Sequence, residues 1–489
     1  MDNEVEKKVA RRERALWVGV TTMLCVGLLI VLVSPAVFAQ GLQSGNDRHI
    51  EVFRQVFEFI ENNYVDEVDA EELLEGALEG MFDSLDDPHS AYLTARDMRG
   101  LTDTTAGEFG GVGLNIVKQP SDDDNGGFVE VVSPIEGTPA FEAGIIANDL
   151  IVEIEDESTR NFSMDEVLNR LRGTPGSDVT VTIQRGSQHR FPVTITRAII
   201  EVPTVRRDMI DDDIGFLRII QFTPYTEDRV KEAIEYFEES GYNSMVIDLR
   251  SNPGGMLTGV VDTANHFFSG GTIVGTRGRI PSENKVFSAR QGQEVPDELP
   301  IVVLIDGGSA SAAEILAGAL KDRERALVLG ETTFGKGSVQ QVRRIGAGGL
   351  RLTMSRYYTP DGTYIDKVGI APDLEIALPS LDDDELEAFA RLRTDGLVRE
   401  FVNDDDDRSR GEINAFIQQL QDDGYDIPEF YLRRMIRDAT NRAKGVTRVY
   451  DLEFDPVLQE AVRILRAGEY GNELRAAAAA AGAADESSN

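Results

Sequence analysis

The sequence predicts an α/β multidomain protein, and three observations support this fold class. The chain has 489 residues, too many for one ordinary core, so two or three domains are expected. Residues 107–198 contain short strands around a single helix, whereas strands and helices alternate regularly over residues 199–380. Helical periodicity fills the flanking segments 40–106 and 381–474. We therefore expect a layered α/β core with an inserted β-rich domain and helical ends.

Residues 1–39 have the pattern of a signal peptide or a membrane anchor. Five basic residues between Lys7 and Arg14 precede the uncharged apolar run Leu16–Val33, and Val37-Phe38-Ala39 fits a cleavage site. The apolar run is longer than a usual signal core and just long enough to span a bilayer. Cleavage and retention both leave the rest of the chain outside the cytoplasm, because the basic flank stays inside. We expect an exported bacterial envelope protein, periplasmic or membrane-anchored.

Charge and cysteine content exclude several kinds of partner. The formal net charge of −37 repels nucleic acid and anionic lipid, and it suits a soluble surface. Cys25 is the only cysteine and the four histidines are scattered, so neither an internal disulfide nor a metal site is expected. No cofactor and no nucleic-acid partner are predicted.

The segment 40–106 begins with helical patterning. Apolar side chains recur at helical spacing between Val52 and Ile60, and again between Leu73 and Leu78. The sequence Asp87-Pro88-His89-Ser90 then ends the helical pattern with a proline-containing turn.

Residues 107–198 predict a small β domain with one helix. Ser163 and Glu166 form a capping box at the start of that helix. The expected strands are Leu114–Val117, Phe128–Val132, Leu150–Ile154, Val179–Gln184 and Arg190–Ile195.

The loops of this domain resemble those of a PDZ domain. The resemblance rests on Gly110-Gly111-Val112-Gly113-Leu114, on Pro139–Ile145, and on Asn148-Asp149-Leu150, where most members have glycine in place of Asn148. It implies that backbone N–H groups of Gly111, Val112, Gly113 and Leu114 bind a peptide carboxylate while the peptide adds as a strand. The alternative is that these glycines only turn the chain. Arg172, just past the helix, either senses the bound peptide or compensates the helix dipole.

Residues 199–380 predict an α/β domain. The expected strands are Ile214–Ile219, Ser244–Leu249, Ile301–Ile305 and Ala326–Leu329, and the expected helices are Thr226–Glu239, Thr258–Phe268 and Ala312–Leu320. After residue 380 the chain is acidic and helical, and the alanine-rich segment 475–489 is expected to be a disordered tail.

The turn before helix Ala312–Leu320 carries two candidate nucleophiles, Ser309 and Ser311. Unpaired N–H groups at a helix N-terminus stabilise an oxyanion, and the helix start favours Ser311 because the Ala312 N–H then points toward the developing charge. An ordinary N-cap serine is the equally weighted alternative. Gly254 and Gly255, at the end of another strand, are candidates for the second oxyanion donor, or simply turn the chain.

Lys336 is the candidate general base. Its ordinary pKa of about 10.4 leaves nearly all of it protonated at neutral pH, so burial must lower the pKa. Flanking glycines permit close approach, and Gln340 shares a face with Lys336 if a strand begins at Lys336. The competing interpretation is a phosphate-binding loop over Gly330–Lys336, but Gly337 stands where a magnesium-binding hydroxyl is needed.

Together, these motifs resemble the carboxyl-terminal processing peptidases, the tail-specific proteases. The resemblance covers roughly residues 50–380: the second serine of Ser309-Ala310-Ser311 precedes Lys336 by 25 residues, and Pro253-Gly254-Gly255 and Asp87-Pro88-His89-Ser90 also match. It implies a ClpP/crotonase-like core, a nucleophile at Ser311, an assisting Gln340, and no metal or nucleotide. It also implies protein substrates cut near their C-termini, and for some members an adaptor lipoprotein and homo-oligomers.

Two function classes fit these motifs. The first is a serine endopeptidase outside the cytoplasm, in which the PDZ domain recognises the substrate tail or gates the site. The second is a non-catalytic, envelope-tethered PDZ scaffold that binds protein C-termini without turnover. Nucleotide binding ranks last.

Overall fold

The computed structural model describes residues 47–489, except 96, 99, 102–106, 119–126, 136, 187–188, 378, 405–406, 445, 447 and 488–489. The chain divides into two compact units, Met1–Tyr92 and Leu93–Asn489. The expected signal peptide or anchor lies outside the described residues. Over the described part of the chain, no helix has both the length and the apolar character needed to cross a bilayer.

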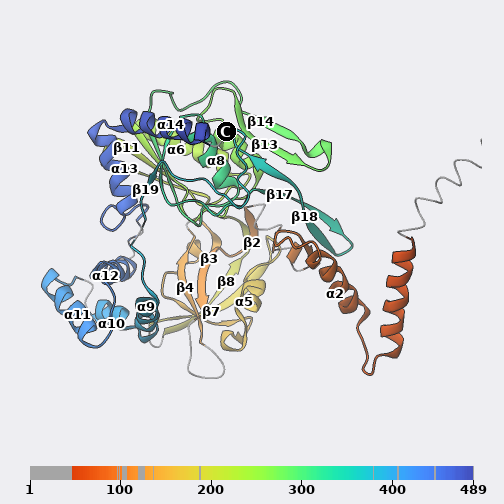
Figure 1. Cartoon of the computed structure of the whole chain (residues 1–489). Helices are drawn as coiled ribbons and strands as arrows, with labels where there is room; N and C mark the ends of the chain where they lie inside the picture. The colour runs from red at the N-terminus through yellow and green to blue at the C-terminus, as the bar shows by residue number, and fades with distance from the viewer. Residues whose placement is uncertain are drawn as a thin grey trace, which may run out of the picture. The chain divides into compact units, whose positions relative to one another are not determined.

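The first unit is helical, as its periodicity predicts. A helix covers residues 47–63, and α2 (Ala70–Asp83) follows it (Figure 1). Asp69 caps α2 by accepting the backbone N–H of Glu71 at 2.7 Å. In the turn that follows, Asp87 accepts the N–H of His89 and the hydroxyl of Ser90, which closes the proline-containing loop. Strand β1 (Ala91–Leu93) comes next.

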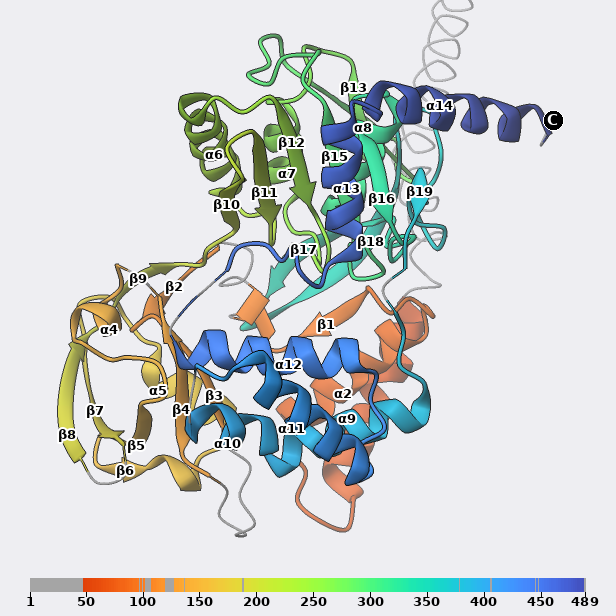
Figure 2. The ribbon, with the colours of Figure 1, turned by 90° about the vertical axis from the view of Figure 1, so that its left-hand side faces the viewer.

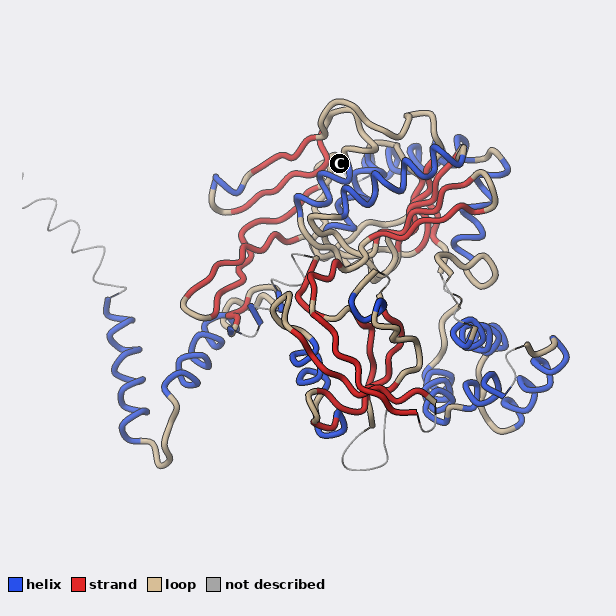
Figure 3. The backbone as a smooth tube through the Cα atoms, turned by 180° about the vertical axis from the view of Figure 1, so that it is seen from behind, coloured by secondary structure: helices blue, strands red, loops and turns tan. Residues whose placement is uncertain are grey.

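The predicted β domain begins the second unit, and all five expected strands are present within two residues of their expected ends. They form an antiparallel sheet in the order β3-β4-β5-β7-β8, with the short β6 beside β5, and Figure 3 draws the strands of the molecule in red. Asn148 has φ 67°, the left-handed conformation that a glycine would otherwise supply. The Ser163–Glu166 capping box is confirmed. The elements are β3 (Leu114–Lys118), β4 (Val129–Pro134), α4 (Pro139–Glu142), β5 (Leu150–Ile154), β6 (Glu157–Ser158), α5 (Met164–Leu171), β7 (Asp178–Arg185) and β8 (His189–Thr196).

A two-stranded ribbon carries the chain into and out of this domain. Strand β2 (Glu108–Gly111) pairs antiparallel with β9 (Ala198–Glu201). Glu201 forms a bidentate ion pair with Arg229 of α6, with both N–O distances 2.8 Å, and Glu108 bonds the hydroxyl of Tyr225. Both strands of the ribbon are therefore attached to the α/β core.

The core sheet has helices on both faces. Its order is β10-β11-β12-β15-β16-β19, parallel except for the edge strand β10. Alternate strand residues pack against α6, α7 and α8 on one face and against α13 on the other, which Figure 2 shows in front of β15 and β16. The elements are β10 (Val205–Ile210), β11 (Ile214–Ile219), α6 (Thr226–Ser240), β12 (Ser244–Asp248), α7 (Leu257–Ala264), β15 (Ile301–Ile305), α8 (Ala312–Asp322), β16 (Leu327–Gly330), β19 (Leu374–Glu375) and α13 (Pro456–Ala467).

A second sheet carries the segment after Lys336. Strands β17 and β18 form a long hairpin, and β18 also pairs with β13, which pairs with β14. Most side chains of β17 are exposed, so hydrophobic patterning gives these strands little signal. The strands are β13 (Thr272–Gly278), β14 (Lys285–Ser288), β17 (Ser338–Ile345) and β18 (Gly348–Tyr358).

The C-terminal region is helical throughout its described length. Helices α9 to α12 share one apolar cluster, and α13 and α14 follow. The disordered tail expected over 475–489 is wrong for residues 475–487, which continue α14; alanine has the highest helix propensity of all residues and outweighs the low sequence complexity. The helices are α9 (Asp383–Asp395), α10 (Leu397–Asp404), α11 (Arg410–Asp422), α12 (Glu429–Ala443) and α14 (Tyr470–Ser487).

The packing of α13 predicts that this late helix stabilises the core. Leu458 is fully buried in the cluster that joins α13 to the sheet, whereas Leu386 of α9 is 51% exposed. We expect Leu458→Ala to lower the free energy of unfolding by about 2–5 kcal/mol in urea denaturation, because it leaves a cavity. Leu386→Ala is the matched control and should change it by less than about 0.5 kcal/mol. Equal effects of the two substitutions would contradict this role of α13.

Candidate active site

Ser311 stands on a strained turn between β15 and α8. It is the N-cap residue of α8 and has φ 56° and ψ −113°, a backbone conformation that residues other than glycine rarely adopt. Strain of this kind gathers at functional sites, and a nucleophilic serine on a sharp strand-to-helix turn is a known case. Ser309 has no exposed surface, and its hydroxyl donates to the carbonyl of Leu249 at 2.8 Å. Ser309 therefore supports the turn, and Ser311 is the better candidate nucleophile.

Glu314, in the first turn of α8, holds the two halves of the site together. Its side chain is fully buried and accepts four hydrogen bonds. Oε2 accepts the backbone N–H of Ser311 at 2.7 Å and that of Lys336 at 2.9 Å. Oε1 accepts the N–H of Gly335 at 2.7 Å and the hydroxyl of Thr333 at 2.6 Å. The candidate nucleophile and the candidate base are thus fastened through their backbones to one oxygen atom.

Glu314 was not among the residues predicted from the sequence. A signal was available, because Ser311 and Glu314 have the spacing of a capping box, in which the glutamate returns to the N-cap amide. What the spacing does not reveal is the other side of the carboxylate, where Gly335 and Lys336 arrive from a distant loop.

The glycine turn lies directly against the nucleophile. A methyl group on Gly254, which has φ 98°, would lie 2.7 Å from Ser311 Cβ and 2.9 Å from the backbone nitrogen of Ala312. Only glycine fits there. The Gly254 N–H donates to Oδ1 of Asn252 at 2.8 Å, while Gly255 follows with φ 141° beside Phe222. The predicted oxyanion residues Gly254, Gly255 and Ala312 are therefore brought together.

Lys336 lies in surroundings that disfavour its charge. It is half-buried, and burial is the main cause that lowers the pKa of its amine. The positive charge of Arg351 on β18 lowers it further, whereas Glu314 acts in the opposite direction. Tyr357 is a neighbour that sequence reasoning missed: burial raises its pKa, and a hydrogen-bonding contact with Ser311 partly offsets this. Tyr357 is therefore a neighbour of the candidate nucleophile.

Gln340 lies near the start of β17, but the simple strand alternation expected for it does not hold. Strand β17 begins at Ser338 rather than Lys336, and its register shifts between Val339 and Gln340. The alternation expected from Lys336 to Gln340 is therefore interrupted. The Gln340 amide donates to Ser338 at 2.8 Å and to Thr353 at 3.3 Å.

The loop that resembles a phosphate-binding loop is occupied by a carboxylate. The N–H groups of Gly335 and Lys336 both donate to Glu314. A phosphate in the same place would meet a buried negative charge and no unpaired donors from these two residues. This geometry argues against nucleotide binding.

The PDZ loop has the backbone that its glycines require. Gly113 has φ 83°, and a methyl group there would lie 2.3 Å from Thr138 Cβ. Gly111 ends β2, Val112 is buried and Leu114 begins β3. Arg172 caps α5 and lies over the ring of Phe109 in the ribbon, 4.8 Å from its centroid. Peptide binding by these residues stays a prediction.

The four bonds of Glu314 predict a loss of hydrolysis on Glu314→Gln. The amide NH₂ cannot accept, so two of the four donors lose their partner, at about 1–3 kcal/mol each for a buried group. We expect hydrolysis of an unfolded protein to fall by about 10²-fold or more, because Ser311 and Lys336 separate. The matched control is Glu412→Gln, which changes an exposed capping box with Ser409 and should leave the rate intact. A Glu314→Gln protein as active as this control would contradict the positioning role of the carboxylate.

The charge of Arg351 predicts a shift in the pH profile. Only the neutral amine of Lys336 accepts a proton, so the rate should rise as pH rises through its pKa. Arg351→Gln removes a charge that lowers this pKa, and the rising limb should therefore move to higher pH. The measurement is kcat/KM against pH, with Arg344→Gln on the exposed end of the same hairpin as control. An unmoved limb in Arg351→Gln would count against Lys336 as the titrating base.

The chain is similar to known peptidases over most of its length. Residues 213–376 match the family model described as peptidase family S41, residues 36–96 match the activating protease CtpB N-terminal domain, and residues 130–185 match a PDZ domain. The chain is 40% identical over 356 residues to the carboxy-terminal-processing protease of Bartonella bacilliformis. The aligned region covers 70% of this chain and 79% of the Bartonella protein. It is 32% identical over 352 residues to the carboxy-terminal processing protease CtpA of Bacillus subtilis, over 72% and 74% of the two chains.

Among solved structures, the photosystem II D1 C-terminal processing protease aligns with a TM-score of 0.40 and 28% identity, over 70% of this chain and 96% of that one. The sequence relatives confirm the family resemblance that the motifs indicated. The chain therefore belongs to peptidase family S41 and is a serine-type, carboxy-terminal-processing peptidase with a PDZ domain.

Proposed function

We propose that this peptidase acts outside the cytoplasm and cuts protein substrates near their C-termini with a Ser311–Lys336 dyad. The observation that carries the proposal is the shared carboxylate of Glu314, which fastens the strained Ser311 and the half-buried Lys336 to one oxygen. A merely structural capping serine has no need of a lysine with a lowered pKa that is bonded to the same carboxylate.

In the proposed reaction, Ser311 Oγ attacks the peptide carbonyl while the neutral Lys336 amine takes its proton. The lysine returns that proton to the leaving amine, which gives an acyl-enzyme and releases the C-terminal fragment. Water then attacks the ester by the same proton route. Because both amide protons of Gln340 point to hydroxyls, its carbonyl oxygen is the group left to orient the Lys336 amine.

The oxyanion is assigned to two backbone donors. The N–H of Ala312 lies at the start of α8, where the helix dipole favours negative charge. The Gly255 N–H is the better second donor, because that of Gly254 already bonds Asn252.

The PDZ domain is proposed to recognise the substrate tail or to gate the site. The support is physical continuity: Arg172 at the end of α5 lies over Phe109, and the ribbon containing Phe109 is attached to α6 by Glu201 and Arg229. The rival, a non-catalytic scaffold, would leave the strain of Ser311 unexplained, and the peptidase family membership argues against it.

The export pattern of residues 1–39 supports a periplasmic or membrane-anchored location. An accessible protein C-terminus is the partner that the PDZ loop fits best.

The test of this function uses the purified protein as the enzyme and an unfolded protein with an apolar C-terminus as the substrate. Ser311→Ala and Lys336→Ala should each lower cleavage by at least about 10³-fold, while Ser282→Ala, on an exposed short helix, should cleave normally. Amidation of the substrate's C-terminus should slow cleavage by the native chain, since it removes the carboxylate that the PDZ loop binds. Undiminished cleavage by either dyad variant would reject the dyad, and equal rates on both substrates would reject tail recognition.

A further inference from the structure

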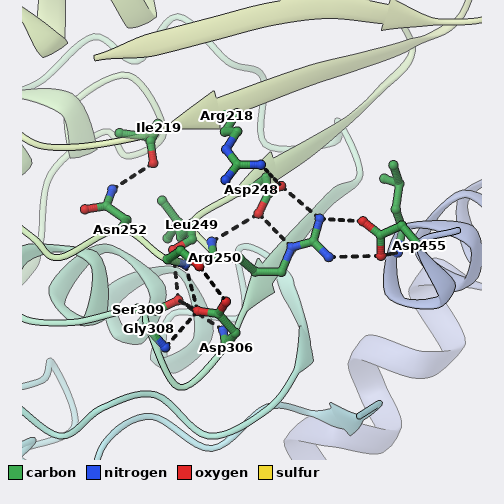
Figure 4. A network of polar contacts seen from close by, with 12 residues as sticks. Arg218, Ile219, Asp248, Leu249, Arg250, Asn252, Asp306, Gly308, Ser309 and Asp455 are labelled. Carbon is green, nitrogen blue, oxygen red and sulfur yellow. Dashed lines mark hydrogen bonds and ion pairs between the residues drawn. The ribbon is translucent and has the colours of Figure 1, made fainter. Parts of the chain in front are cut away.

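Arg250 lies at the junction between the core sheet and the glycine turn. It lies two residues after Asp248, the last residue of β12, and precedes the Ser251–Gly255 turn. Its guanidinium bonds Asp248 twice, at 2.9 Å from Nε and 2.9 Å from Nη2. It also bonds Asp455 twice, at 2.9 Å from Nη1 and 2.6 Å from Nη2, as Figure 4 shows. One arginine, with 14% of its side chain exposed, is thus held between two carboxylates.

Asp455 comes from a part of the chain 205 residues further on. It is the N-cap of α13, and its Oδ1 also accepts the backbone N–H of Leu458 at 3.0 Å. Leu458 and its neighbours Val457 and Ala461 are buried against the sheet, so the helix that carries Asp455 cannot shift easily. Its carboxylate is a fixed point for the arginine.

The turn after Arg250 is tied to the nucleophile turn. Ser251 has φ 56°, and its N–H donates to Asp306 at 2.7 Å. Asn252 has no exposed surface: its carbonyl accepts the N–H of Ala310 at 2.9 Å, and its side chain bonds Gly254. A displacement of Arg250 would therefore be transmitted through Ser251 and Asn252 to Gly254 and Ala310.

The charge balance of this junction explains why one carboxylate does not suffice. Asp248 is already shared, since Arg218 lies 3.6 Å from it. Burial opposes the charge of Arg250, but the hydrogen bonds and charges of Asp248 and Asp455 outweigh it and raise its pKa. Without Asp455, Nη1 would lose its acceptor, and the guanidinium would be drawn toward Asp248 alone.

We infer that Asp455 is a positioning residue of the active site: through Arg250 it holds the Ser251–Gly255 turn where the Gly255 N–H meets the oxyanion. The inference rests on the proposed Ser311–Lys336 chemistry. It makes a helix near the C-terminal end of the chain part of the catalytic apparatus, although α13 contributes no reacting group.

The test is Asp455→Asn, because asparagine is as good an N-cap as aspartate but carries no charge. The matched control is Asp382→Asn, the same substitution at the N-cap of α9, where the side chain bonds its own helix through Glu385. Initial rates, melting temperature and inhibition by a peptide boronate, which forms a tetrahedral adduct on serine, are measured for both. We expect Asp455→Asn to lower kcat by about 10- to 100-fold and weaken boronate inhibition similarly, with KM within about twofold. Asp382→Asn should match the native chain in all three.

The outcomes separate this inference from the proposed function. If Ser311→Ala is inactive and Asp455→Asn keeps native kcat and boronate affinity, the inference is overturned and the dyad stands. The inference also fails if the rate falls only in proportion to the folded fraction. If Ser311→Ala remains active, both fail. Should Asp455→Asn melt below the assay temperature, Asp455→Ser, which keeps an N-cap hydroxyl, is assayed in the cold by the same criteria.

Discussion

The buried carboxylate of Glu314 is the interaction on which the rest of the site depends. Ser311 and Lys336 come from different elements, a helix start and a loop between two sheets, and neither element alone determines the position of the other. Each donates its backbone N–H to Oε2, and Oε1 binds the same loop at Thr333 and Gly335. All four partners donate, which suits an ionised carboxylate that accepts on both oxygens. The separation of the proposed nucleophile and the proposed base is thereby set by backbone hydrogen bonds, which leaves both side chains available for the proposed reaction.

The Glu314 carboxylate that positions Lys336 also opposes the proposed role of Lys336 as a base. A negative charge next to Lys336 favours the ammonium form, whereas a general base must be neutral. The site compensates by burying the lysine and by placing Arg351 near it, and both lower the pKa of the amine. At the same time, four hydrogen bonds donate to the Glu314 carboxylate, which limits the effect of its charge on the Lys336 amine. Among the described residues, no carboxylate is hydrogen-bonded to the amine of Lys336. Glu314 instead bonds the backbone N–H of Lys336, so burial and Arg351 can still lower the pKa of the amine.

Sequence patterning predicted the elements whose signal is local. The apolar runs of β11 and β15 have the same bounds in the structure as in the prediction, and α8 begins where its small residues indicated. The β17–β18 hairpin was not predicted in full, because β17 is mostly exposed and β18 mostly half-buried, so neither strand has a clear period of buried and exposed residues. The role of Glu314 and the bond between Arg250 and Asp455 were out of reach for another reason. They join residues 22 and 205 positions apart in the chain, and a single sequence does not reveal such pairs.

The arrangement at the carboxyl ends of the parallel strands shows why the C-terminal helix reaches the site at all. Asp248 and the nucleophile turn lie at the same edge of the sheet, since β12 and β15 are parallel neighbours. Helix α13 packs on the face of the core sheet opposite to α8, so the buried side chains of α13 are separated from the site by the sheet. Its N-terminus reaches that edge, however, and the residue there must accept a helix amide and face Arg250. An aspartate satisfies both demands with one side chain, because both of its oxygens accept from the guanidinium while Oδ1 also accepts the N–H of Leu458, and the helix dipole and Arg250 both favour its negative charge.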